Sequence, residues 1–261
     1  PAAAASADPD GSPAGPVYTE PLGIALEGLP YPHPVALVPL AIEGQDVRMA
    51  YMDVRPQGSP DASTVVLLHG KNFFGAYWRD TIGVLTAAGY RVVVPDQVGF
   101  GRSSKPDIHY SFDLLARNTI ELLDRLGVRR FVVVGHSMGG MLAVRLARAY
   151  PDRASGLVLE NPIGLEDYRE KVPPQPTEWF YRNELGLTTE AFRGFVRRYV
   201  VRWDAARYEP YVEARARVML SGEYPRWARV GALTSQMIYQ QPVRHEFGLI
   251  RVPTLLVIGQ E

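Results

Sequence analysis

The sequence contains no cysteine among its 261 residues. Disulfides, thiolate metal sites and a cysteine nucleophile are therefore excluded. The chain also has no net charge, because 28 lysines and arginines balance 28 aspartates and glutamates. No overall field then attracts nucleic acid or an anionic membrane. Because no apolar run approaches the ~20 residues that a membrane-spanning helix needs, we expect neither a nucleic-acid partner nor a transmembrane segment.

The first residues are rich in alanine and carry no charge before Asp8. Ala5-Ser6-Ala7 has the small-x-small pattern of a signal-peptidase site, and residues 8–16 continue as a polar stretch rich in proline and glycine. This pattern favours a periplasmic or secreted location. The alternative is an ordinary disordered terminus of a cytoplasmic protein.

Short apolar runs alternate with helical patterns along most of the chain. Runs typical of strands buried on both faces occupy 64–68, 91–94, 131–134, 157–159 and 254–258. Amphipathic patterns typical of helices occupy 78–88, 112–126 and 138–150. This alternation predicts an α/β fold with a mostly parallel central sheet flanked by helices.

The segments outside this alternation predict the remaining organisation. Two strand-like runs, 35–42 and 47–54, flank the turn signal Glu43-Gly44-Gln45 and predict an antiparallel hairpin. Pro39 in the first run indicates an edge strand. Residues 1–34 are rich in proline, glycine and alanine and predict a flexible N-terminal segment.

Residues 163–246 interrupt the alternation and are mainly helical in pattern, rich in arginine, tyrosine and tryptophan. An insertion before the strand at 254–258 lies above the carboxyl edge of the sheet, where ligands bind in open α/β folds. We therefore expect a helical cap over 163–246. The core would then comprise residues 35–162 and 247–261.

The strongest chemical signal is Gly135-His136-Ser137-Met138-Gly139-Gly140, which stands between a predicted strand and a predicted helix. At such a turn a serine is held in a strained conformation that presents its hydroxyl. The N-terminus of the following helix also favours developing negative charge. We predict that Ser137 is a nucleophile, and the alternative is a purely structural turn.

A second signal, His69-Gly70-Lys71-Asn72, follows the strand at 64–68. Acyl transfer needs two backbone donors for the tetrahedral oxyanion. We expect these donors to be the N–H of Met138, directly after the nucleophile, and the N–H of Lys71 in this earlier loop. A tight His-Gly turn without a catalytic role is the alternative.

Together, the His69-Gly70 loop, residues 96–106 (DQVGFGRSSKP) and Gly135 to Gly140 resemble the α/β-hydrolase superfamily, in its capped serine hydrolase branch. This branch also holds epoxide hydrolases, haloalkane dehalogenases and carbon–carbon bond hydrolases. The resemblance implies an eight-stranded sheet and a Ser–acid–His triad. A serine at 137 argues against epoxide and haloalkane chemistry, which use a carboxylate nucleophile in this superfamily.

The resemblance orders the triad as nucleophile, acid and histidine. His245 is the only histidine after Ser137, but it precedes the strand at 254–258, whereas the resemblance puts the catalytic histidine after one further strand. We therefore expect the final strand, the final helix and the catalytic histidine beyond Glu261. An omitted tail, a cleaved remainder that stays bound as a partner, and a true truncation remain open.

Two positions are candidates for the acid. The resemblance implies a Gly-x-x-Asp turn after the strand at 254–258, and Gly259-Gln260-Glu261 is similar to its beginning. The acid would be Glu261, displaced by one position, or a residue beyond it. Some family members carry the acid at the earlier strand end, where Glu160 stands. The alternative for Glu160 is a carboxylate that supports the neighbouring loop.

These signals predict a hydrolase of carboxylic esters or related acyl compounds that acts through an acyl-serine intermediate on a small apolar substrate. They imply no metal and no organic cofactor. Asp96 is expected to be a structural hydrogen-bonding residue. Aromatic residues of the cap could line an acyl pocket, but most of them are expected to form the core of the cap and none is assigned as a binding residue: Trp179, Phe180, Tyr181, Trp203 and Trp227. A carbon–carbon bond hydrolase, a cofactor-free perhydrolase and a non-catalytic ligand-binding homologue are the alternatives.

Overall fold

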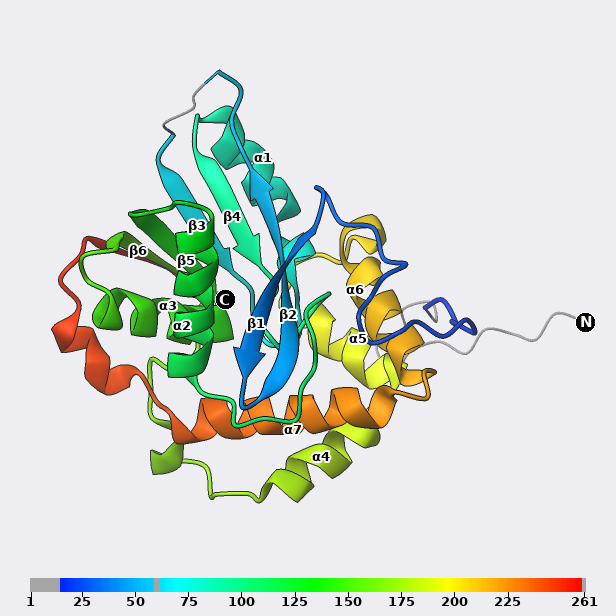
Figure 1. Ribbon diagram of the computed structural model, residues 1–261. Coiled ribbons are helices and arrows are strands. Elements are labelled where there is room, and N and C mark those ends of the chain that lie inside the picture. Colours follow the sequence, from blue (N-terminus) through cyan, green and yellow to red (C-terminus); the bar gives the residue numbers. More distant parts are fainter. Residues whose placement is uncertain (1–14, 59–61, 260–261) are drawn as a thin grey trace, which may run out of the picture.

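A computed structural model describes residues 15–58 and 62–259, and its centre is one seven-stranded sheet (Figure 1). The strands are Ala36–Ile42 (β1), Gln45–Val54 (β2), Thr64–Leu68 (β3), Arg91–Pro95 (β4), Phe131–His136 (β5), Ala154–Glu160 (β6) and Thr254–Val257 (β7). Their order is β1-β2-β4-β3-β5-β6-β7, with β2 antiparallel to both of its neighbours and β3 to β7 all parallel. The predicted parallel sheet and the hairpin with β1 at the edge are confirmed.

Helices cover both faces of this sheet. The core helices are Arg79–Ala87 (α1), Phe112–Arg125 (α2) and Met138–Ala149 (α3). Alternate residues of β3 point to opposite faces: Val66 and Leu68 join the cluster that contains α2 and α3, whereas Val65 and Leu67 pack with Ile82 of α1. All five residues of β3 are buried, which explains its uninterrupted apolar sequence.

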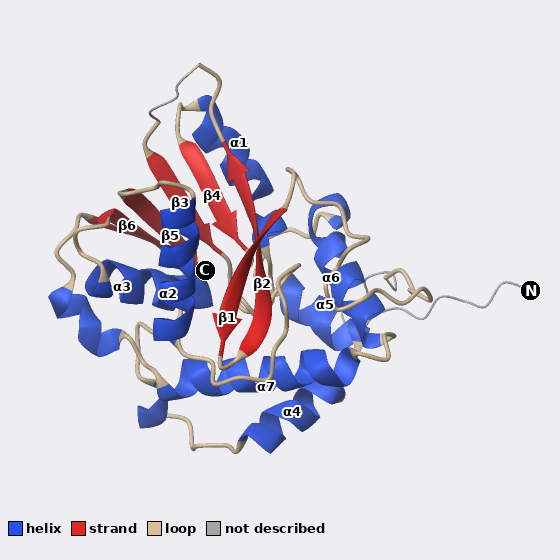
Figure 2. Ribbon diagram, viewed as in Figure 1, coloured by secondary structure: helices blue, strands red, loops and turns tan. Residues whose placement is uncertain are grey.

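A helical insertion, residues 161–253, separates β6 from β7. Its helices are Thr177–Leu185 (α4), Thr189–Arg197 (α5), Ala205–Met219 (α6) and Tyr224–Gln240 (α7), and its 3-10 turns are Tyr168–Glu170 (η2) and Arg244–Leu249 (η3). A further 3-10 turn, Gly75–Trp78 (η1), belongs to the core. In Figure 2 these four helices gather below and to the right of the sheet. The insertion is thus helical, as its sequence predicts.

The segment before β1 differs from its prediction. Leu22, Ile24, Leu26 and Leu29 are buried, and they pack between the core residues Phe74 and Ala76 and the helices α6 and α7. The prediction of a flexible segment is therefore wrong for these residues. Leu22, Ile24 and Leu26 alternate as in a strand, but Pro21, Gly23 and Gly28 interrupt the run and no regular element forms there, so the sequence indicates a loop and not a buried segment. The export signal predicted over residues 1–7 lies outside the described residues.

The opposite edge of the sheet is formed by β7. All four of its residues are exposed, and Leu255 is 57% exposed although its sequence is apolar. Among the described residues the sheet has seven strands, so the eighth that the resemblance implies is not part of it. Gln260 and Glu261, which include one candidate acid, lie outside the described residues. No described helix is both long and apolar enough to cross a membrane.

Candidate active site

Ser137 stands at a sharp turn between β5 and α3. Its backbone has φ 53° and ψ −119°, a conformation that non-glycine residues rarely adopt. The turn is tight because a Cβ on Gly135 would lie 2.2 Å from the carbonyl oxygen of Gly139, and a Cβ on Gly139 would lie 2.2 Å from that of Leu68. Only glycine fits at 135 and 139, which is the steric reason for the G-x-S-x-G spacing.

The hydroxyl of Ser137 is not used to cap its helix. Ser111, Thr188 and Asp204, at the N-caps of α2, α5 and α6, each accept a hydrogen bond from a backbone N–H of the first turn. Ser137 occupies the same position in α3, but its side chain makes no cap bond. The Ser137 hydroxyl is therefore not engaged by the first turn of α3.

The loop after β3 lies directly against this turn. A Cβ placed on Gly70 would lie 3.0 Å from the Ser137 Cβ, so the two backbones approach closely. The N–H of Phe73 donates to the carbonyl oxygen of Gly70 at 3.1 Å and closes a turn with Lys71 at its first central position. Within the described residues no acceptor bonds the N–H of Lys71. Met138 opens α3, where an N–H has no intrahelical acceptor.

His69, at the start of this loop, is a fully buried structural residue. Its Nε2 accepts from the backbone N–H of Gln97 at 3.0 Å, which places the proton on Nδ1, 2.9 Å from the carbonyl oxygen of Gly70. Burial lowers the pKa of His69. Both ring nitrogens are therefore occupied, and the neutral imidazole fixes the Gly70 backbone instead of acting as a base.

Asp96, in the loop after β4, holds the other end of the same loop. It is 1% exposed and accepts from the backbone N–H of Gly75 at 2.6 Å and of Arg102 at 2.8 Å. The hydroxyl of Tyr31 donates to it at 2.7 Å. The expectation that Asp96 is a structural hydrogen-bonding residue agrees with these contacts.

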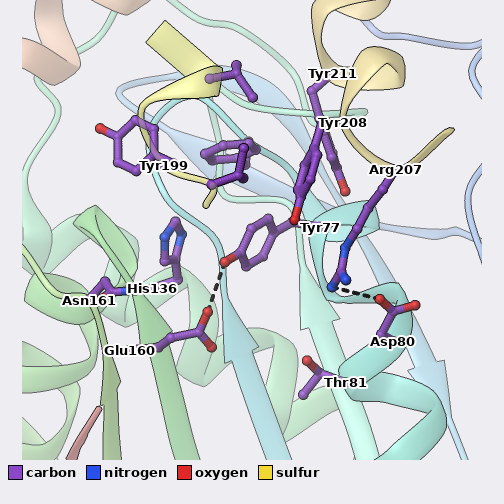
Figure 3. A pocket seen from close by; sticks show the side chains of 13 residues that line it. Tyr77, Asp80, Thr81, His136, Glu160, Asn161, Tyr199, Arg207, Tyr208 and Tyr211 are labelled. Atoms are coloured by element: carbon purple, nitrogen blue, oxygen red, sulfur yellow. Dashed lines mark hydrogen bonds and ion pairs between the residues drawn. The ribbon is translucent and has the colours of Figure 1, made fainter. Parts of the chain in front are cut away.

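Glu160 ends β6 beside the serine turn, and its carbonyl oxygen accepts from the N–H of Ser137 at 3.3 Å. Its carboxylate accepts from the hydroxyl of Tyr77 at 2.8 Å (Figure 3). Burial, and then the charge of Glu160, raises the pKa of Tyr77, so its phenol stays protonated as a donor. The structure thus brings Glu160 to Ser137 through the backbone and engages its carboxylate with Tyr77.

A cavity of about 170 Å³ opens beside the same residues. From the core it is lined by Phe73, Tyr77, Asp80, Thr81, His136 and Glu160, and from the helical insertion by Asn161, Val196, Tyr199, Val200, Arg207, Tyr208 and Tyr211. Figure 3 shows the tyrosine rings of the insertion facing His136 and Tyr77, with Arg207 bonded to Asp80 at one side. The lining therefore combines aromatic rings with carboxylate, hydroxyl, amide and guanidinium groups.

The aromatic residues that the sequence offered for the pocket are not those that line it. None of Trp179, Phe180, Tyr181, Trp203 and Trp227 lines this cavity. Trp203 packs on Tyr208, and Trp179 and Phe180 pack on each other. Sequence analysis missed Tyr77, Tyr199, Tyr208 and Tyr211, since no motif distinguishes a tyrosine that lines a cavity from one that packs.

No hydrogen bond joins the Ser137 hydroxyl to a histidine in the described part of the chain. His245 lies in the insertion instead, with its Nε2 3.4 Å from Oδ2 of Asp167 and an exposed ring. His136 is buried and stacked on Tyr77, with ring centroids 4.5 Å apart. Ser137, the loop after β3 and Glu160 therefore meet without an assigned base.

Comparison with known proteins gives a family. The profile of the family described as the alpha/beta hydrolase fold matches residues 63–261. A probable hydrolytic enzyme from Pseudomonas aeruginosa PAO1 has a solved structure with a TM-score of 0.88 and 43% sequence identity, and the match covers 91% of this chain and 77% of that one.

Two curated proteins match over shorter stretches. A haloalkane dehalogenase from Psychrobacter cryohalolentis is 35% identical over 133 residues, which are 49% of this chain and 43% of that protein. A putative carbamate hydrolase, RutD, from Variovorax paradoxus is 37% identical over 105 residues, 40% of each chain. The matches thus span less than half the length of these relatives.

Proposed function

The chain belongs to the α/β-hydrolase family, and we propose that it is a serine hydrolase that cleaves carboxylic esters or related acyl compounds through an acyl-Ser137 intermediate. One observation carries the proposal: the Ser137 hydroxyl is held at a strained turn, free of its helix, against the loop that bears Lys71. A serine placed only for structure would cap α3, as Ser111 caps α2.

In the proposed reaction Ser137 Oγ attacks the carbonyl carbon of the substrate, and a base accepts the hydroxyl proton. The backbone N–H groups of Lys71 and Met138 donate to the oxyanion, as two converging donors do in acyl transfer. The leaving alcohol departs with a proton, and water then releases the acid from Ser137. Glu160 is the proposed acid that orients the base, and no described residue is assigned as that base.

The relatives include a dehalogenase, but the nucleophile position argues for acyl transfer. Haloalkane dehalogenases and epoxide hydrolases that the sequence resembles attack with a carboxylate, and this chain has Ser137 at that position. A serine forms a stable, hydrolysable ester with an acyl group. The proposal therefore favours esters and related acyl compounds over alkyl halides and epoxides.

The cavity beside the turn supports a small substrate. Its volume of about 170 Å³ is close to that of the ~150 Å³ protein cavity that accepts one benzene ring. A short aliphatic chain or a single ring fits such a space, and a polymer does not. We further propose that the helical insertion acts as a cap, since Tyr199, Tyr208 and Tyr211 close one side of the cavity.

Covalent labelling tests the proposal. The natural protein is treated with a fluorophosphonate probe, which phosphonylates activated serines, and its intact mass is measured before and after. We expect one adduct in the natural protein and none in Ser137→Ala. Ser111→Ala, which removes a serine that does cap its helix, is the matched control and should be labelled like the natural protein. An adduct that persists in Ser137→Ala would contradict the proposal.

A further inference from the structure

The side chain of Lys71 has a use that the oxyanion role does not require. Its Nζ lies 3.0 Å from Oε1 of Glu184, which stands near the end of α4 in the helical insertion. The two residues are 113 positions apart in the sequence. The loop that faces Ser137 is therefore bonded through its central residue to the helices above the sheet.

This ion pair is shielded from water. The Lys71 and Glu184 side chains are 17% and 13% exposed, whereas the pair between Arg182 and Glu178 on the same helix is 77% and 59% exposed. Charges at such a site are screened little by salt or solvent. Burial alone would raise the pKa of Glu184, but the positive charges of Lys71 and Arg215 lower it to about 2. The carboxylate is thus ionised throughout the neutral range.

Glu184 is in turn fixed by the insertion. Arg215 of α6 bonds its second carboxylate oxygen, and the Arg215 guanidinium lies 5.7 Å from the ring of Trp227 in α7. Gly231 of α7 leaves room for the carboxylate, because a Cβ there would lie 2.8 Å from the carboxyl carbon of Glu184. Three helices of the insertion therefore set the position of the oxygen that Lys71 meets.

The backbone of Lys71 is restrained from two sides. The turn that Gly70 and Phe73 close uses neither the N–H nor the carbonyl oxygen of Lys71. The carbonyl group of Gly70 shares a planar peptide unit with the Lys71 N–H, and the Phe73 N–H and Nδ1 of His69 hold it from the core. Beyond this peptide unit, the Lys71 residue is held from the insertion, through the side chain that Glu184 bonds.

We propose that Glu184 is a positioning residue for the oxyanion hole, which holds the Lys71 backbone N–H toward Ser137 through a buried ion pair with the Lys71 side chain. This inference rests on the proposed function and adds that the helical insertion, besides lining the cavity, sets the geometry of the oxyanion donor. The helices α4 and α6 then supply one of the restraints that hold the donor in place.

The rate of phosphonylation of Ser137 tests the inference, because the probe develops negative charge at the oxygen that the oxyanion donors bind. Saturation kinetics with a fluorophosphonate in the natural protein separate the maximal rate, kinact, from the binding constant, KI. We expect Glu184→Gln to lower kinact roughly 10- to 100-fold, as a displaced donor does, and to leave KI nearly unchanged. A residue that only stabilises the fold would not lower kinact while leaving KI nearly unchanged.

Lys71→Met is the second variant, because it leaves Glu184 paired with Arg215 and so avoids a buried unpaired carboxylate. It should lower kinact as Glu184→Gln does, and the double variant should be no slower than the slower single one, since both remove one interaction. Lys71→Arg keeps the charge and should restore most of the rate.

Glu178→Gln, which breaks the exposed pair on the same helix, is the control and should leave kinact unchanged. Folded variants with unchanged kinact, or with a raised KI alone, would overturn the positioning role. That result differs from failure of the proposed function, in which Ser137→Ala itself is labelled.

Discussion

His136 precedes the proposed nucleophile and is enclosed by aromatic rings. Its imidazole is stacked on Tyr77 and meets the edge of Phe73 at 5.8 Å between centroids. Its Nδ1 is buried and has no hydrogen-bond partner among the residues that the structure describes. Burial, and then the nearby His69, lowers the pKa of His136 to about 4. The ring is therefore neutral in the folded protein at neutral pH and serves as packing.

This lowered pKa predicts a pH dependence of stability. Between pH 4 and 6.5 the unfolded chain binds a proton at His136 that the folded protein does not bind, so the free energy of unfolding falls as pH falls across this window. The free energy of unfolding should therefore be lower at pH 4.5 than at pH 7, and we expect His136→Phe to reduce this difference by a value on the order of 2 kcal/mol. Urea unfolding at pH 4.5 and pH 7 measures it.

The matched control is His109→Phe, which removes an exposed histidine from a connecting loop. It should leave the difference between the two pH values as it is in the natural protein. An equally steep pH dependence in His136→Phe and in the natural protein would contradict the prediction.

At the scale of elements, the junction of β5 and α3 depends on two close backbone approaches. Gly139→Ala places a methyl group against the carbonyl oxygen of Leu68, and β3 cannot move away because all its residues are buried. We expect the free energy of unfolding to fall by about 3 kcal/mol or more. Chemical denaturation measures the loss.

Gly83→Ala in α1 is the control for this substitution. Nothing lies within 4 Å of a Cβ at that position, and alanine stabilises a helix interior by about 0.5–1 kcal/mol relative to glycine. The two glycine-to-alanine changes should therefore shift stability in opposite directions. Equal effects would mean that the tight junction is not what requires Gly139.

The elements that the sequence predicts well are those whose burial leaves a pattern. The run at 64–68 is apolar after Thr64 because β3 is covered on both faces, and its bounds are found without error. The glycines around Ser137 reflect contacts a few residues away, so a short motif contains them. The chain order of strands and helices then determines the fold family.

The features that were missed depend on contacts between distant residues. Glu184 resembles any surface glutamate of an amphipathic helix, and only the fold brings it to Lys71. Tyr208 and Tyr211 line the cavity because the fold brings α6 against core residues such as Phe73, which no local pattern encodes. The same holds for Leu26, whose burial is specified by residues of α6 and α7.

At the scale of the whole molecule, the segment before β1 connects the core with the helical insertion. The N–H of Leu22 donates to the carbonyl oxygen of Arg217 in α6 at 3.0 Å, and the cluster around Leu26 includes Phe74 of the loop after β3. Because Arg102 bonds the carbonyl oxygens of Glu27 and Leu29, the segment is fixed from the core side as well.

We therefore expect Leu26→Ala to lower the free energy of unfolding by about 2–4 kcal/mol, since a fully buried leucine leaves a cavity. Urea denaturation measures it. Leu37→Ala removes the same atoms from a residue of β1 that is 48% exposed, and it should cost less than about 1 kcal/mol. Similar losses in the two variants would show that the segment does not contribute to the core.

The backbone at Ser137 also sets a limit on how the sequence can evolve. A residue other than glycine at φ 53° and ψ −119° costs on the order of 1–3 kcal/mol, and glycine at that position would remove most of the cost. Selection for stability alone therefore drives codon 137 toward glycine. A lineage that loses the need for the reaction should lose this serine early, while the neighbouring glycines persist.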